Sequence, residues 1–149
     1  MKISFKGDYA LKALLDLALH SKDGKVQIVD IAKRQDIPLK YLSQILVILK
    51  GAGYVQSRRG PGGGYWLAKL PEQITLGEVL RLMDGPTSPI SCVSRSGYSK
   101  CNDEPFCPFV GIWIKVRDAV NEIVDNTTFE DICEIVKKQN AGSNFTYYI

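Results

Sequence analysis

Three of the four cysteines in this chain, Cys92, Cys101 and Cys107, fall within a single stretch of 16 residues. Thiolates are the natural ligands of iron–sulfur clusters, and binding of a cluster can order the loop that carries them. A structural zinc site usually has closely paired ligands, and this stretch has no such pair. Three buried structural thiols would show the same spacing, so the spacing alone leaves both interpretations open.

The fourth cysteine, Cys133, and the only histidine, His20, indicate structural roles. Cys133 falls on a predicted final helix, where a free thiol usually packs in the core. His20 falls at the end of a predicted helix, where its charged form complements the helix dipole. Because the histidine follows no local cysteine or serine pattern of a nucleophile and its base, the sequence does not predict an enzyme.

A second group with chemical potential is the pair Arg58 and Arg59, which directly precedes the glycine-rich run 60–64. The glycines of this run, with Gly60 and Gly62 foremost, let the backbone approach a partner closely. Arginine beside such a tip can enter the narrow minor groove of DNA, where the potential is most negative. A nucleotide-binding phosphate loop is disfavoured because the run lacks the Gly-Lys-Ser/Thr ending.

The elements that must position these residues follow from apolar spacing. Apolar side chains recur every three or four residues over 8–20, 27–34 and 39–50, which predicts three helices. Two β-prone runs, 54–58 and 65–68, then flank the glycine-rich tip and predict a hairpin. Three helices followed by a two-stranded wing predict a mainly α fold, a winged helix-turn-helix.

The third predicted helix presents Lys40, Tyr41, Ser43 and Gln44 on its polar side. In a helix-turn-helix the second helix of the motif fits the major groove and offers such side chains to base edges. Glutamine can pair with adenine, serine is a less selective partner, and Lys40 and Tyr41 suit phosphate contacts. The same residues could form the solvated face of a core helix, but helix, wing and charge agree on DNA binding.

The rest of the chain predicts a helix over 75–83, a long irregular loop and a helix over 109–125. The apolar face of the 109–125 helix is wide enough to need two partners, and a second subunit is a natural one. A capping box from Thr127 to Glu130 predicts a last helix to about Lys138, followed by a tail over 140–149. We expect a DNA-binding domain (1–84), a cysteine-containing sensor loop (85–108) and a dimerisation segment (109–149).

Charge is distributed unevenly along the 149 residues, although the net charge is only +3. Residues 1–70 carry 12 Lys and Arg against 5 Asp and Glu, whereas the rest of the chain is net acidic. A basic half favours a polyanionic partner. Neither a signal peptide nor an apolar membrane-spanning run is present, so the sequence predicts a cytoplasmic protein in which disulfides are not expected.

Taken together, these motifs resemble the bacterial iron–sulfur-cluster-regulator family of winged-helix transcription factors. The resemblance covers nearly the whole chain except the tail, and its most specific part is the wing run. It is carried by Asp8-Tyr-Ala-Leu-Lys-Ala-Leu14, Ile31-Ala32, Tyr41-Leu-Ser-Gln44, Gly51-Ala-Gly53, Arg59-Gly-Pro-Gly-Gly-Gly-Tyr65 and Ile74-Thr-Leu-Gly-Glu-Val79.

The resemblance implies a homodimer, paired through the long helix, that binds a palindromic site on double-stranded DNA. It assigns DNA contacts to Tyr41, Ser43, Gln44 and Arg59. One departure is Ser43, since a member of the family has glutamate at this site-reading position. The target sequence is therefore expected to differ.

For the cysteine loop, the resemblance implies an iron–sulfur cluster, [2Fe-2S] or [4Fe-4S], held by the three cysteines. Val110 stands where one member has a ligand histidine, and it cannot ligate. Asp8 matches a position from which a nitric-oxide-sensing member supplies a ligand to the other subunit; a carboxylate favoured by the helix dipole is the alternative. A cluster-free regulator, responding to thiol oxidation or a small thiol metabolite, is the second interpretation of the loop.

Overall fold

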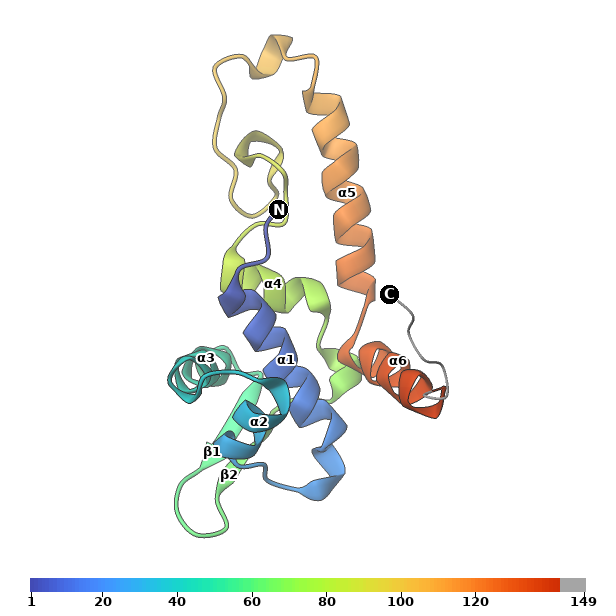
Figure 1. Ribbon diagram of the computed structural model, residues 1–149. Coiled ribbons are helices and arrows are strands. Elements are labelled where there is room, and N and C mark those ends of the chain that lie inside the picture. Colours follow the sequence, from blue (N-terminus) through green and yellow to red (C-terminus); the bar gives the residue numbers. More distant parts are fainter. Residues whose placement is uncertain (143–149) are drawn as a thin grey trace.

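Helix α1 (Phe5–Leu19) lies at the centre of the N-terminal half, because one of its faces consists of small and aliphatic side chains (Figure 1). The computed structural model describes residues 1–142. Ala10, Ala13 and Leu14 are fully buried, and α1 contacts the second, third, fourth and sixth helices. The helix begins three residues before the predicted start, because the side chain of Ser4 caps it by accepting a hydrogen bond from the Gly7 N–H at 3.0 Å.

The predicted mainly α winged helix-turn-helix is confirmed, and the predicted element boundaries agree with the structure to within three residues. The further helices and strands are α2 (Ile28–Gln35), α3 (Leu39–Gly51), β1 (Val55–Arg58), β2 (Gly64–Leu67), α4 (Leu76–Asp84), α5 (Val110–Asn126) and α6 (Phe129–Ala141). Short 3-10 turns are η1 (Ser21–Asp23), η2 (Pro71–Gln73), η3 (Ser91–Val93) and η4 (Glu104–Phe106). The expected tail lies outside the described residues from position 143 onward.

An ion pair between a buried carboxylate on α1 and a half-exposed arginine on α2 joins the two helices. The carboxylate of Asp16, which is fully buried, accepts hydrogen bonds from Arg34 Nε at 2.9 Å and Arg34 Nη2 at 2.7 Å. Gln35 Nε2 donates a third bond at 3.1 Å. The hydrogen bond to Asp16 raises the pKa of Arg34. This geometry holds α2 in a fixed place against α1, and α2 in turn packs on α3.

The two-stranded sheet is a short antiparallel hairpin in which Val55 pairs with Leu67 and Arg58 pairs with Gly64. Val26, just before α2, extends it through an isolated bridge to Tyr65. The base of the hairpin is therefore fixed on the helical core, while its tip projects beyond it (Figure 1).

Helix α6 begins one residue later than predicted. Its N-cap is Thr128, whose hydroxyl oxygen accepts from the Asp131 N–H at 3.2 Å, while the Asp131 carboxylate accepts from the Thr128 N–H at 2.8 Å. The Thr128 hydroxyl also donates to the Asp131 carboxylate at 2.7 Å, and this bond, together with that from the Thr128 N–H, lowers the pKa of Asp131. The predicted box from Thr127 to Glu130 is wrong, because the Thr127 hydroxyl instead donates to the Ile123 carbonyl at 2.7 Å and closes α5.

Helix α5 extends away from the helical core and meets it only near its C-terminal end (Figure 1). Among the described residues of α5, only Val124 is buried. The apolar line that the sequence predicted along this region is exposed, and it consists of Phe109, Ile112, Val116, Ala119 and Ile123. So much exposed apolar surface on one helix is typical of a face that packs against another protein chain.

Candidate nucleic-acid interface and cysteine loop

Helix α3 has one buried face and one exposed face, as its sequence predicted. Leu42, Ile45, Leu46 and Leu49 are buried in the core on the side toward α1. Lys40, Tyr41 and Gln44 are exposed on the other side. Ser43 is half-buried, and its hydroxyl donates to the Lys40 carbonyl at 2.9 Å. Pro38 is the N-cap residue, so the exposed positions 40, 41 and 44 lie in the first two turns of the helix.

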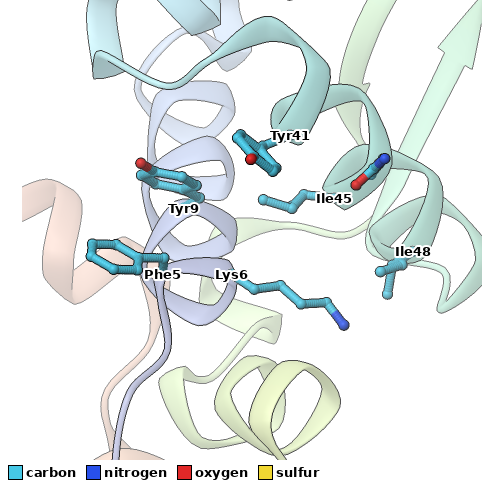
Figure 2. A pocket seen from close by; sticks show the side chains of 7 residues that line it. Phe5, Lys6, Tyr9, Tyr41, Ile45 and Ile48 are labelled. Atoms are coloured by element: carbon cyan, nitrogen blue, oxygen red, sulfur yellow. The ribbon is translucent and has the colours of Figure 1, made fainter.

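A hollow of about 640 Å³ separates α1 from the exposed side of α3 (Figure 2). It is lined by Phe5, Lys6 and Tyr9 from α1 and by Tyr41, Gln44, Ile45 and Ile48 from α3. Sequence reasoning missed the α1 side of this hollow, because the helix was expected to begin only at Asp8. The side chain of Tyr41 borders this open space, so it is accessible to a partner that approaches α3.

The tip of the wing has a backbone that only glycine adopts easily. Gly60 and Gly62 have φ of 88° and 71°, in the left-handed region that disfavours other residues. A Cβ on Gly63 would lie 2.2 Å from the carbonyl oxygen of Arg58, so this position has no room for a side chain. Gln27 Nε2 donates to the Gly63 carbonyl at 2.6 Å. The tip is therefore both tightly turned and braced by the segment before α2.

Arg58 and Arg59 lie exposed at the end of β1, where the wing faces the C-terminal half of α3. Together with Val47 and Lys50 of α3 they line a hollow of about 170 Å³. Neither arginine forms an ion pair with any of residues 1–142. Val47, 70% exposed, is a candidate contact that sequence reasoning missed, since an aliphatic residue in a helix is expected to face the core.

Charge on this surface has a single sign. The stretch 39–67, which forms α3 and the wing, contains Lys40, Lys50, Arg58 and Arg59 but no Asp or Glu. Lys50 is held toward the wing, since its Nζ donates to Ser57 Oγ at 2.8 Å. A convex helix and a hairpin that both carry uncompensated cations suit a polyanion with two neighbouring grooves.

The cysteine loop connects α4 to α5 and runs beside α5 (Figure 1). Cys92 lies in η3, Cys107 directly follows η4, and Cys101 lies between them; all three are free thiols, of which Cys101 is exposed. Burial raises the pKa of the Cys92 thiol, and the nearby Cys101 and Glu104 raise it further. The loop thus brings the three thiols into one region of the structure.

The thiols fit an iron–sulfur cluster in the chemistry of the donor set, because cluster irons are held by cysteine thiolates. Within residues 1–142, however, no three His, Cys, Asp or Glu side chains are gathered closely enough to hold a metal ion. Asp8, the fourth candidate ligand, lies in the first turn of α1 and forms an ion pair with Lys12 at 2.7 Å. A cluster would therefore require the loop to draw its cysteines together.

His20 and Cys133 occupy the structural positions expected from the sequence. His20 is the C-cap of α1, and its Nδ1 lies 2.8 Å from the carbonyl oxygen of Asp16. Cys133 is buried in α6, and burial raises the pKa of its thiol.

These positions predict different thiol reactivities in the reduced protein after treatment with a chelator. Iodoacetamide at pH 8 is expected to modify exposed Cys101 rapidly and Cys133 only after unfolding, because the thiolate is the nucleophile and burial disfavours it. Mass spectrometry of timed digests measures both rates, and urea-unfolded protein provides the control. Equal rates for the two residues in the folded protein would contradict the buried position of Cys133.

Three packed helices, a basic helix face and a glycine-tipped wing define a winged-helix DNA-binding protein. The chain belongs to the Rrf2 family, described as an iron-dependent transcriptional regulator, which it matches over residues 3–135. The family and its relatives are transcriptional regulators and not enzymes. Within residues 1–142, no helix has the length and apolar character to cross a membrane.

Two curated relatives and one solved structure resemble the chain over most of its length. The HTH-type transcriptional regulator CymR of Bacillus subtilis is 37% identical over 149 residues, covering 100% of both chains. The HTH-type transcriptional regulator IscR of Yersinia enterocolitica is 36% identical over 152 residues, covering 98% of this chain and 91% of the relative. The solved structure of CymR, the global cysteine regulator of B. subtilis, superposes with a TM-score of 0.77 and 35% identity over 91% of this chain and 98% of its own.

Proposed function

We propose that this protein is a homodimeric transcriptional regulator that senses iron–sulfur status, redox state or nitric oxide through a cluster held by Cys92, Cys101 and Cys107. The observation that carries the proposal is the placement of three free thiols on one loop beside α5. It acts in the cytoplasm, where thiols stay reduced. The Rrf2 family, to which the chain belongs, is described as iron-dependent, which supports a role for iron in sensing.

In the proposed complex, α3 lies in the major groove of a palindromic operator. Ser43 and Gln44 face base edges, while Lys40 and Tyr41 contact phosphates, in keeping with their positions on the first two turns of the helix. The wing lies along the DNA backbone next to the major groove that α3 occupies. Its tip glycines, Gly60 and Gly62, bring the main chain close to DNA, and Arg58 and Arg59 reach the minor groove.

The dimer is proposed to form through α5, whose exposed apolar face includes Phe109 and Ile112. Residues 1–84 then bind DNA, 85–108 sense, and 109–149 dimerise. A dimer that binds one face of DNA must hold its two recognition helices about 34 Å apart. Since α4 packs on both α1 and α5, a change in the loop that follows α4 can alter this spacing.

When bound, an iron–sulfur cluster supplies a redox-active centre whose potential depends on its ligands and their surroundings. The protein's part is to provide the three thiolates and to hold the loop in one arrangement. Asp8 of the partner subunit is the proposed fourth ligand, which would require it to leave Lys12. The dimer is proposed to have one arrangement that binds DNA and one that does not. The cluster can change DNA affinity only if these two arrangements bind it with different affinity.

A second candidate function keeps DNA binding and omits iron. It is favoured by the similarity to CymR, the global cysteine regulator of B. subtilis. The exposed thiol of Cys101 would then respond directly to oxidation or to a small thiol metabolite.

Anaerobic purification tests the choice between the two. We expect iron and acid-labile sulfide in the wild-type protein, and loss of most of both in Cys92→Ala, Cys101→Ala and Cys107→Ala. Cys133→Ala is the matched control and should retain them, because Cys133 is buried away from the loop in α6. A colourless wild-type sample, or three loop variants that hold iron as well as the wild type, would contradict the cluster.

A further inference from the structure

A polar hollow of about 180 Å³ lies where the first part of the cysteine loop passes between α4 and α5. Three guanidinium groups line it, one from each neighbouring element: Arg81 from α4, Arg95 from the loop and Arg117 from α5. Thr87 and Ser94 of the loop and Asn121 of α5 add polar atoms to the wall. We call this hollow the arginine pocket.

The arginine pocket has more positive than negative groups. Arg81 is paired with Asp125, and Arg95 and Arg117 share a single carboxylate, that of Asp118, at 2.9 and 2.8 Å. Three cations are therefore balanced by two anions. Arg117 also donates from Nη1 to the Val93 carbonyl at 2.7 Å, which fixes its guanidinium within the pocket.

Hydrogen-bond donors in the wall are already oriented. Thr87, only 5% exposed, donates its hydroxyl to Asn121 Oδ1, which leaves the Asn121 amide NH2 without an acceptor among the described residues. Ser94, 6% exposed, accepts from the Gly97 N–H at 2.9 Å and keeps its own O–H free to donate. Surplus positive charge and preformed donors in a small hollow are the features that recognise an oxyanion.

We propose that the arginine pocket binds a small oxyanion, namely a phosphate, a sulfate or a short carboxylate. A volume of about 150 Å³ accommodates a molecule the size of benzene, so the pocket suits a ligand of only a few heavy atoms. Arg95 and Arg117 line the pocket side by side, since both bind Asp118 Oδ1, and a charged guanidinium group is a strong hydrogen-bond donor to all three anions.

The position of the arginine pocket gives the bound anion a regulatory consequence, which rests on the proposed sensing function. The anion connects α5 to both sides of η3, the turn that carries Cys92. It therefore holds the start of the cysteine loop against α5. In the absence of the anion, this part of the loop is held by fewer contacts and can rearrange more easily.

Thermal unfolding of the full chain with sodium phosphate, sulfate or acetate, each matched in ionic strength by sodium chloride, tests the binding. A ligand of the folded state raises Tm in a saturable way. Arg95→Gln is expected to weaken the best anion roughly 10-fold or more, since one charge-assisted contact is lost. Because the Arg95 side chain is 66% exposed, this variant should fold.

Lys100→Gln is the matched control, since it removes the same charge from an exposed position of the same loop that does not line the pocket. Wild-type affinity in Lys100→Gln together with weakened binding in Arg95→Gln supports the site. Equal affinity in both variants, or no saturable response to any of the three anions, overturns it.

DNA affinity, measured with and without the best anion, separates this proposal from the proposed function. A change in affinity that Arg95→Gln abolishes supports the regulatory consequence, and an unchanged affinity overturns that consequence. If the protein does not bind DNA at all while saturable anion binding persists, the proposed function fails and the anion site stands.

Discussion

Replacing both wing arginines, as Arg58→Ala with Arg59→Ala, is expected to weaken binding to operator DNA about 100-fold or more. Each arginine is exposed and has no ion-pair partner among residues 1–142, so its charge is available to DNA. One arginine–DNA contact contributes about 1–3 kcal/mol, and the two act on neighbouring parts of the duplex. The salt dependence of the affinity should also become shallower, by roughly one unit of slope per lost contact.

Fluorescence anisotropy over a series of salt concentrations measures both effects. The control is Lys137→Ala with Lys138→Ala, which removes the same net charge from exposed positions on α6. Both double variants should retain the wild-type circular dichroism and Tm. An equal loss of affinity in the two would assign the effect to net charge and not to the wing.

The DNA-binding half could be predicted from the sequence because its determinants are local. The apolar spacing of α3 identifies both the buried face and the exposed positions 40, 41 and 44 without any tertiary information. The wing is equally local, since a glycine-rich tip between two β-prone runs has few other conformations. Ser43 was predicted to be as exposed as its neighbours, but it is half-buried. Its hydroxyl donates to the Lys40 carbonyl in the preceding turn of the helix, which the apolar spacing does not predict.

Features that depend on packing between distant segments could not be predicted. The hollow between α1 and α3, and the arginine pocket between α4, the loop and α5, exist only because of how these elements pack. The error at the start of α6 is different, since two adjacent threonines could each cap the helix, and only the structure shows that the Thr127 hydroxyl bonds back to α5 while Thr128 caps α6.

The cysteine loop is an intermediate case. Its spacing predicts thiol chemistry, but it has no apolar period that would fix its path, and its conformation follows from contacts such as that of Arg117 with Val93. Resemblance to known regulators supplied the cluster hypothesis that spacing alone left open. The resemblance also supplied Asp8 as the candidate fourth ligand, which the structure shows paired with Lys12.

Asp16 is the most important residue that the sequence analysis did not identify. It lies on α1 beside the fully buried positions 13 and 17, and a carboxylate at that place in an apolar helix is a signal that could have been used. Its partners, Arg34 and Gln35, are 18 and 19 residues away in the chain, so only the fold reveals the contact.

Arg34→Ala is expected to lower the free energy of unfolding by about 1–3 kcal/mol, because it leaves the buried carboxylate of Asp16 without its counter-ion, although water partly screens the half-exposed Arg34 guanidinium. Of the side-chain hydrogen bonds to this carboxylate, only that from Gln35 then remains. Urea unfolding measures the change as a shift of the midpoint at constant slope. Lys33→Ala, at the adjacent exposed position of α2, is the control and should change stability by less than about 0.5 kcal/mol.

The double variant Asp16→Leu with Arg34→Met separates the ion pair from simple loss of packing. A buried pair replaced on both sides by apolar groups is often nearly neutral, whereas removal of one partner is costly. The double variant should therefore be more stable than Arg34→Ala alone. A double variant that is less stable than Arg34→Ala would contradict this prediction. The contact would then stabilise the fold through packing and not through charge.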